Sequence, residues 1–477
     1  MTMELYNNND LKLVDKNIDS IIETIENVRK KLYPRPQDNE PETVTETYTS
    51  TETSKTEQSP TPEDIAKIVK ITLDFVSNKK RKVYGGYAQN KVISFKNKAD
   101  AFYKDDEIPD IDVYSPSPID DLVELCDLLR SQGYDDVVGK EAMHKETYKI
   151  FTKGYNAIDL SYVPKNIYDN IPYVEIDNIR YTHPLFSMID LYRMMSEPLF
   201  SSWRWKKIFV RLQLLQKHYP FQKINANPVS KPHKKNMDKV FEIIKEYVKS
   251  NTDVYIFGDF AYNEFVKEAK MKDVAYANIK SYQIVSTDYK KTAETLIKKL
   301  KETNTNISYE EYYPFWTFTG HSVEISCGGE LIAKVYGSIK RCCPIKTTID
   351  NIQIGSFDYV LLMEMVTGFR EKVLRNKNGK IYHDTIISNL IKMRKYYFDK
   401  NEKTLLDNTL FQSFISSCVG EAIDPIMEAQ RLRKERKEKK GSALFIYKPV
   451  RELKNKWVFA NTSGNKINNP KNLKLKI

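Results

Sequence analysis

The phrase YGGYAQN at residues 84–90 returns as FGDFAYN at residues 257–263. Each copy follows a short β-type run, Arg81–Tyr84 in one case and Val254–Phe257 in the other. Glycine after such a run lets the backbone turn sharply where a side chain would interfere. The phrase therefore predicts a strand, a tight turn and a helix, used twice in one chain.

Further matching segments follow both copies in one order, and they combine β-type runs with helical periodicity. We interpret the series as an internal duplication, which predicts an α+β fold of two tandem units with helical additions. The matched pairs are DIDVYS (Asp110–Ser115) with SYQIVS (Ser281–Ser286), the helices IDDLVELCDLL with TAETLIKKL, AIDLSY (Ala157–Tyr162) with SVEISC (Ser322–Cys327), and NIRY plus SMIDLYRMM (Asn178–Met195) with NIQI plus VLLMEMV (Asn351–Val366).

Carboxylates distinguish the first unit. Asp110 and Asp112 are two apart on a predicted strand, so their side chains project from one face while Ile111 points into the sheet. Asp159 alternates with apolar residues on a later strand and can supply a third ligand. Oxygen ligands of this kind suit Mg²⁺ or Mn²⁺, and three carboxylates on adjacent strands can hold two ions. We therefore expect Asp110, Asp112 and Asp159 to be catalytic metal ligands.

The first glycine pair is the candidate phosphate site. Gly85 and Gly86 lie between a strand and a helix, where exposed backbone N–H groups and the helix N-terminus can receive a triphosphate. We add Tyr87 and Asn90, from the same phrase, to the predicted nucleotide-binding residues. A single D-x-D or Gly-Gly is usually only a turn. The ordered combination with the later aspartate is more specific and predicts a nucleotidyltransferase palm.

YGGYAQN, then DIDVY, then AIDLSY resemble the catalytic signature of the polymerase-β-like nucleotidyltransferases. The wider pattern, over roughly residues 63–400, is similar to the poxvirus-type catalytic subunit of poly(A) polymerase in the versions carried by giant DNA viruses. The resemblance implies that the three aspartates bind the catalytic metals and that the two glycines meet the nucleotide phosphates. The insert KNKADAFYKDDE before Asp110 makes this chain longer than the family's compact signature.

The second unit lacks the same chemistry. SYQIV stands in the place of DIDVY and contains no carboxylate, so Glu324, expected opposite Asp159, cannot assemble a two-ion site alone. Asp259 replaces the second glycine and would repel a triphosphate. We therefore predict that the second unit is catalytically dead.

The chain divides, by its composition and periodicity, into five predicted segments. Apolar residues at helical spacing over Leu11–Leu32 predict an amphipathic helix, and a Thr-, Glu-, Ser- and Pro-rich stretch predicts a disordered acidic linker. Thr61 and Pro62 predict the capped start of the folded part. The segments are an N-terminal helix (1–36), the linker (37–62), the catalytic domain (63–230), the pseudo-nucleotidyltransferase domain (231–400) and a basic C-terminal extension (401–477).

An excess of positive charge favours an acidic partner such as RNA. The net charge is +11 and the pI is near 9.0. The stretch WRWKK supplies Trp203, Arg204, Lys206 and Lys207 for stacking bases and meeting phosphates. The alternative is that such basic runs are solvated helix faces, and that the two tryptophans of this stretch are core residues.

The cysteines and the hydropathy indicate the compartment. Five cysteines show no metal-ligand spacing, and we expect reduced thiols in a cytosol-like environment. The N-terminus has no apolar signal region, and no uninterrupted apolar run is long enough to span a membrane. We expect a soluble protein of the host cytoplasm or viral factory, which the virion can also carry.

Together these features predict a template-independent poly(A) polymerase that adds AMP from ATP to mRNA 3′ ends with two Mg²⁺ or Mn²⁺ ions. The alternatives are a terminal uridylyl- or CCA-type transferase, because nothing in the motif reads the base, and a non-catalytic RNA-binding scaffold. The family implies a homodimer or a processivity subunit. We expect a homodimer, with the RNA 3′ end and ATP as ligands.

Overall fold

The computed structural model describes residues 2–35, 60–104, 107, 109–142, 144–228, 237–303, 306–339, 341–420, 423–438, 445–448 and 470–471. The chain forms two compact units. One contains residues 29–187 and 424–461, and the other contains residues 1–28, 188–423 and 462–477. We call them the β3 unit and the β11 unit, after a central strand of each sheet. The linker expected at 37–62 lies almost wholly outside the described residues and stays a prediction.

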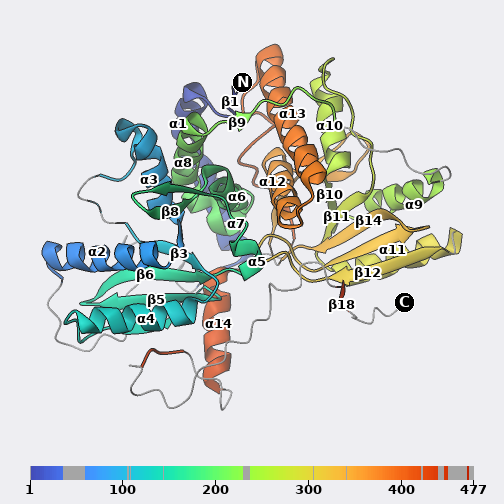
Figure 1. The fold of residues 1–477 in the computed structure, drawn as a ribbon. Helices are drawn as coiled ribbons and strands as arrows, with labels where there is room; N and C mark the ends of the chain where they lie inside the picture. The colour runs from blue at the N-terminus through green and yellow to red at the C-terminus, as the bar shows by residue number, and fades with distance from the viewer. Residues whose placement is uncertain are drawn as a thin grey trace. The chain divides into compact units, whose positions relative to one another are not determined.

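The β3 unit is built on a mixed sheet, whose described strands run in the order β4-β5-β6-β3-β2-β8-β7. Figure 1 labels β3, β5, β6 and β8 of this sheet. Strand β3 pairs antiparallel with β2 and parallel with β6, and β2 pairs parallel with β8. The outer pairs on both sides are antiparallel. The strands are β2 (Lys82–Tyr84), β3 (Asp112–Ser115), β4 (Val138–Glu141), β5 (Thr147–Thr152), β6 (Tyr155–Tyr162), β7 (Tyr173–Ile176) and β8 (Ile179–Thr182).

Helices α2 and α4 both contact the strands of this sheet and also contact each other (Figure 1). The predicted start of α2 is confirmed, because Thr61 and Asp64 form a reciprocal capping box and Pro62 is the first helical residue. The helices of the unit are α2 (Pro62–Asn78), α3 (Gly85–Lys96), α4 (Pro118–Ser131), α5 (Lys165–Tyr168) and α14 (Pro425–Glu438).

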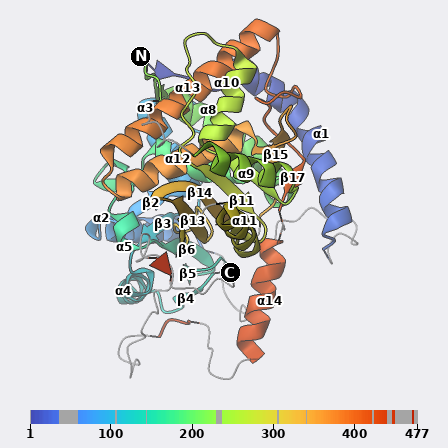
Figure 2. The ribbon, with the colours of Figure 1, turned by 90° about the vertical axis from the view of Figure 1, so that its right-hand side faces the viewer.

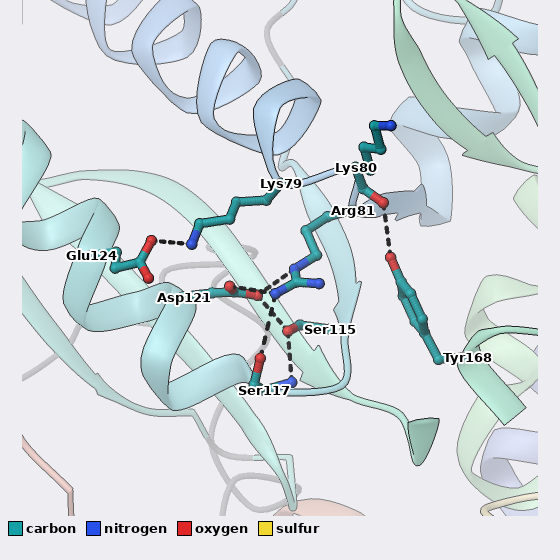
Figure 3. A network of polar contacts seen from close by, with 8 residues as sticks. All are labelled: Lys79, Lys80, Arg81, Ser115, Ser117, Asp121, Glu124 and Tyr168. Atoms are coloured by element: carbon teal, nitrogen blue, oxygen red, sulfur yellow. Dashed lines mark hydrogen bonds and ion pairs between the residues drawn. The ribbon is translucent and has the colours of Figure 1, made fainter. Parts of the chain in front are cut away.

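A buried ion pair ties the start of β2 to α4 (Figure 3). Arg81 Nε and Nη2 lie 2.7 and 2.8 Å from the two oxygens of Asp121, a forked geometry that a guanidinium favours. Ser115, at the end of β3, bonds to the same carboxylate and accepts the backbone N–H of Ser117 at 3.0 Å. Lys79 of the preceding turn pairs with Glu124. The network holds the end of β3 at a fixed position in the sheet.

The β11 unit contains a larger described sheet, in the order β17-β15-β16-β10-β11-β14-β13-β12-β18. Without its two outermost strands, this order reproduces the sheet of the β3 unit strand for strand, with the same parallel and antiparallel senses. The strands are β10 (Val254–Phe257), β11 (Tyr282–Ser286), β12 (Ile307–Tyr312), β13 (Ser322–Cys327), β14 (Glu330–Gly337), β15 (Cys343–Thr347), β16 (Gln353–Gly355), β17 (Cys418–Val419) and β18 (Pro470–Lys471), with the separate pair β1 (Thr2–Met3) and β9 (Phe221–Gln222).

Helices α10, α12 and α13 gather in the β11 unit, and α13 contacts both of the others (Figures 1 and 2). The amphipathic helix predicted at Leu11–Leu32 is confirmed as α1, which buries Val14, Ile18 and Ile25. Among the described helices, none is long and apolar enough to cross a membrane. The helices are α1 (Asn8–Leu32, which ends in the β3 unit), α6 (Pro184–Met195, which begins in the β3 unit), α7 (Pro198–Ser201), α8 (Trp205–His218), α9 (Asp238–Lys249), α10 (Asp259–Ala269), α11 (Tyr289–Thr303), α12 (Phe357–Val373) and α13 (Lys377–Asn401).

Two sequence-based expectations are wrong. By strand order, AIDLSY on β6 corresponds to β14, whereas SVEISC is β13 and corresponds to β5. The sequence alignment paired the wrong strands because β6 and β13 both carry an apolar–acidic–apolar pattern. The second error concerns the thiols: Cys342 and Cys418 form a disulfide, while Cys126, Cys327 and Cys343 are free and buried.

Candidate active site

The turn at Gly85 brings the end of β2 against a carboxylate of β3. Gly85 has φ +71°, a conformation that side chains disfavour, and a Cβ added there would lie 2.2 Å from Asp112 Oδ2. The helix α3 begins at this glycine, and its N-cap, Tyr84, makes no side-chain capping bond. A negative group at a helix start is favoured by the backbone N–H groups there. The predicted strand–glycine–helix turn is therefore present, and it abuts Asp112.

Two of the three predicted aspartates are brought together directly. Asp112 of β3 and Asp159 of β6 are register partners on neighbouring parallel strands. The backbone N–H of Asp159 donates to the carbonyl of Ile111 at 2.9 Å. Ile111 is buried, so the predicted alternation of carboxylate and apolar residue holds. Asp110 is exposed and precedes the first residue of the strand.

Asp159 is held by two side chains that the sequence did not single out. Lys149 Nζ lies 2.8 and 2.6 Å from its two oxygens, and Asn156 Nδ2 donates to Oδ1 at 2.9 Å. Lys149 is the register partner of Asp159 on β5, so both project from the same face. The Oδ1 atom of Asn156 is buried without a hydrogen-bond partner in the described structure. A polar atom of this kind is satisfied by a ligand or a water.

Tyrosines line the surroundings of Asp110. Burial, and then the charges of Asp110 and Tyr87, raise the pKa of Tyr155 to about 12, so its hydroxyl stays protonated at neutral pH. That hydroxyl is also buried without a partner among the described residues. Tyr84 stacks on Tyr114, with ring centroids 3.8 Å apart. Only chain folding could reveal Tyr155, Asn156 and Lys149 as site residues, since no local motif marks them.

The donor set suits divalent cations, but it is not assembled as a cluster. No three carboxylate, histidine or cysteine groups stand together as a metal site in the described parts of the chain. The side chains of Asp112 and Asp159 project from the same face of neighbouring strands, and the missing side chain at Gly85 lets the carboxylate of Asp112 lie against the turn. The Lys149 ammonium already neutralises Asp159. The residues therefore fit a hard cation if Lys149 turns away.

Asn90 has a different contact from the predicted one. Its Oδ1 accepts the backbone N–H groups of Phe102 and Tyr103 at 2.8 and 3.1 Å. Asn263, at the matching place in the second phrase, holds Ala277 in the same way at 2.7 Å. The repeated asparagine thus fastens the loop that follows each helix.

The second phrase has the same turn with other side chains around it. Gly258 has φ +70°, and a Cβ there would lie 2.9 Å from Gln283 Cγ. By register, Gln283 corresponds to Asp112 and Lys334 corresponds to Asp159. Glu324, on the strand that corresponds to β5, pairs with Lys334 at 2.7 Å. The acid–base pair across these two strands has therefore exchanged its charges.

The WRWKK stretch lies in the β11 unit and divides into core and surface. Trp205 is fully buried, with Nε1 donating to the carbonyl of Met194 at 3.0 Å, as the core alternative expected. Trp203 is 49% exposed and carries the Arg204 guanidinium at 4.4 Å from its ring centre. Lys206 and Lys207 are exposed, and Lys206 pairs with Asp19 at 3.1 Å. Trp203 and its basic neighbours are thus on the surface.

Two family models match the chain. Residues 70–201 match "Poly(A) polymerase catalytic subunit", and residues 213–477, more than half of the chain, match "APMV, Putative poly(A) polymerase, catalytic subunit, C-terminal". The chain belongs to the poly(A) polymerase catalytic subunit family. The "Putative poly(A) polymerase catalytic subunit" of Acanthamoeba polyphaga mimivirus is 34% identical over 86% of this chain and 78% of its own length.

Other members of the poly(A) polymerase family are also similar. A relative from African swine fever virus (isolate Pig/Kenya/KEN-50/1950) is 32% identical over 33% of this chain and 34% of its own length. The crystal structure of the Megavirus polyadenylate synthase superposes with a TM-score of 0.82 at 32% identity, covering 98% of this chain and 94% of the other. The predicted recognition, the α+β class and the polynucleotide adenylyltransferase activity are confirmed.

Proposed function

We propose that the β3 unit is the catalytic unit and that Asp110, Asp112 and Asp159 bind two divalent cations, Mg²⁺ or Mn²⁺. The direct register of Asp112 with Asp159, beside the Gly85 turn, is the observation that carries this assignment. Such ions activate the attacking RNA 3′-hydroxyl and neutralise charge on the leaving pyrophosphate. The exposed position of Asp110 lets it turn toward either ion.

The remaining groups position the reactants. Gly85 lets the carboxylate of Asp112 lie against the start of α3, and the N-terminus of that helix stabilises the negative charge of a phosphate. Asn156 orients the carboxylate of Asp159, which accepts the proton of the 3′-hydroxyl. The protonated hydroxyl of Tyr155 and the free oxygen of Asn156 offer hydrogen bonds to the ribose. Gly86, Tyr87 and Asn90 complete the nucleotide-binding stretch.

The β11 unit is, in this proposal, a duplicated nucleotidyltransferase that has lost its reaction. Its matching strand order supports a common origin with the β3 unit. Gln283 and Lys334 stand where Asp112 and Asp159 stand, so a cation would meet a neutral amide and an ammonium. Two metal ions cannot bind to that pair of side chains.

In the β11 unit, a side chain of helix α13 contacts the residue that follows the Gly258 turn. The hydroxyl of Tyr382, from α13, donates to Asp259 Oδ1 at 2.5 Å at the start of α10. His383 Nδ1 and Glu364 Oε2 lie 2.7 Å apart close by. The acidic group and the covering tyrosine both oppose the binding of a triphosphate there.

RNA binding and assembly are finer parts of the proposal. Trp203, Arg204, Lys206 and Lys207 present a ring and cations to an RNA strand. The RNA 3′ end and ATP are the substrates, and a homodimer retains the RNA between additions. We place the protein in the host cytoplasm or viral factory. The domain boundaries given above belong to the same proposal.

Primer extension with each nucleotide separately tests the function. ATP should be incorporated into tails, and Asp112→Asn or Asp159→Asn should each lower the rate by about a thousandfold or more. Glu324→Gln, in the β11 unit, is the matched control and should stay within about twofold of the wild type. A preference for UTP would select the uridylyl alternative. Full activity of both aspartate variants would refute the site, and light scattering that gives a monomer would refute the dimer.

A further inference from the structure

A cavity lies within the β11 unit. It offers about 40 Å³ to the centres of water-sized molecules, more than the roughly 10–15 Å³ that one water requires. Binding pockets for small ligands combine apolar walls with a few convergent polar groups. Its apolar walls include Phe318, Tyr336, Leu362 and Val366. The polar groups are Arg193, Ser196 and Arg341.

The carboxylate recorded beside the Arg341 guanidinium, that of Glu197, lies 3.7 Å from Nε, beyond hydrogen-bond distance. The arginine side chain is 26% exposed. Burial and then the neighbouring charge of Arg193 lower the pKa of Arg341. Glu197 and Asp190 offset part of the positive charge of the two arginines. Arg341 still presents a guanidinium that an anion in the cavity can bind.

The other two polar groups complete a binding geometry. Arg193 is fixed by Asp190 at 3.1 Å and by the hydroxyl of Thr317 at 3.3 Å. Ser196 is 3% exposed, and its Oγ has no hydrogen-bond partner in the described structure. A buried hydroxyl without a partner costs free energy unless something in the cavity satisfies it. The hydroxyl of Ser196 therefore has a hydrogen bond to offer to a ligand in the cavity.

The backbone that carries Arg341 is fastened on both sides. The next residue, Cys342, is disulfide-bonded to Cys418. The carbonyl of Arg341 lies so close to Gly420 that a Cβ there would meet it at 2.1 Å. Its N–H donates to the carbonyl of Ser338 at 3.2 Å. A rigid frame lowers the entropy that binding must overcome.

We propose that this cavity binds a phosphate group, either as a free phosphate or pyrophosphate ion or as part of a nucleotide. Guanidinium groups bind phosphate through paired hydrogen bonds, and a serine hydroxyl can donate a third. The cavity is lined by Val285 and Gly337, farther along β11 and β14 than Gln283 and Lys334. The site is therefore separate from the turn at Gly258, and it does not depend on the proposed catalytic aspartates.

Calorimetric titration of the full chain tests the proposal, with inorganic phosphate and pyrophosphate as probes and chloride added to equalise ionic strength. The wild type should bind one of the two ions. Arg341→Gln should weaken that binding by about tenfold or more, and Ser196→Ala should weaken it by about threefold. Arg375→Gln is the matched control, because Arg375 is exposed and outside the cavity lining.

Further arms separate the sources of the phosphate. Titration of AMP and of a 5′-phosphorylated RNA trinucleotide, with the Asp112→Asn chain, shows whether a nucleotide or strand carries the group. The site is supported if Arg341→Gln lowers the affinity for any of these probes and Arg375→Gln does not. No binding of any probe at about 10 mM, or equal binding by all variants, would overturn it. Thermal melting of Arg341→Gln and Ser196→Ala verifies that both fold.

Discussion

Lys149 Nζ lies within 2.8 Å of both carboxylate oxygens of Asp159. The equivalent pair in the β11 unit has its charges exchanged, with Lys334 on the strand of Asp159 and Glu324 on the strand of Lys149. Both units thus keep one neutral pair across the same two strands. In the β3 unit the carboxylate of the pair, Asp159, lies on the strand next to Asp112. In the β11 unit the carboxylate, Glu324, lies one strand farther from the equivalent residue, Gln283.

Lys149→Met should raise the affinity for Mn²⁺ in the absence of nucleotide by roughly tenfold, about 1.4 kcal/mol. The ammonium competes with a cation for Asp159, and its removal leaves the carboxylate uncompensated. Electron paramagnetic resonance of free Mn²⁺ measures the affinity. Lys165→Met is the control, because that lysine pairs with Asp169 on an exposed helix. Weaker or unchanged Mn²⁺ binding by Lys149→Met would contradict the competition.

Alanine at the two equivalent glycines should separate catalysis from folding. Both Gly85 and Gly258 have φ near +70°, so each alanine variant should lose about 1–2 kcal/mol of unfolding free energy. Gly85→Ala also displaces Asp112 and should lower tailing by about a hundredfold. Gly258→Ala should remain active once its lower stability is accounted for. Chemical denaturation and primer extension measure the two effects, and equal losses of activity would count against the assignment.

The carboxyl of Asp259 should make stability depend on pH. Burial is the largest cause that raises its pKa, to about 6 from the ordinary 3.8. Because the folded-state pKa is the higher one, its contribution is fully present below pH 3.8 and is lost as the pH rises through 6. The free energy of unfolding of Asp259→Asn should therefore exceed that of the wild type by roughly 1–2 kcal/mol at pH 7.5, and the variant should melt at a higher temperature. At pH 4 the two proteins should be equally stable.

His383 reinforces the same trend and must be measured alongside. Burial lowers the pKa of His383, but Glu364 outweighs it, and the net shift is upward. Its contribution is likewise present at low pH and lost at higher pH. His383→Gln in the Asp259→Asn chain should remove the remaining slope of melting temperature against pH. A slope unchanged by either substitution would show that other groups control it.

Reduction of the Cys342–Cys418 disulfide should destabilise the β11 unit by about 2–4 kcal/mol, because the bond closes a long loop. Melting with and without reductant measures the loss. A Cys418→Ser chain should already melt at the lower temperature and should not respond to reductant. If reductant lowers the melting temperature of that variant as well, another thiol reaction is responsible.

Local patterns determined much of this molecule. The capping signal at Thr61 and Pro62 and the strand–glycine–helix turn need only neighbouring residues, and both are present. The alternation of Ile111 with Asp112 follows from the period of a strand. The helix cap, the glycine turn and the outward position of Asp112 could therefore be predicted from the sequence.

Register and strand order were decided only by the tertiary structure. Three features depend on how distant strands align. They are the pairing of Lys149 with Asp159, the correspondence of β6 with β14, and the disulfide at Cys342. A shift of one residue would turn every side chain of a strand to the other face, and similar apolar–acidic patterns on β6 and β13 cannot distinguish two registers. Hydrogen bonding across the whole sheet makes that choice, and it is the physical reason why the partners of Asp159 could not be predicted.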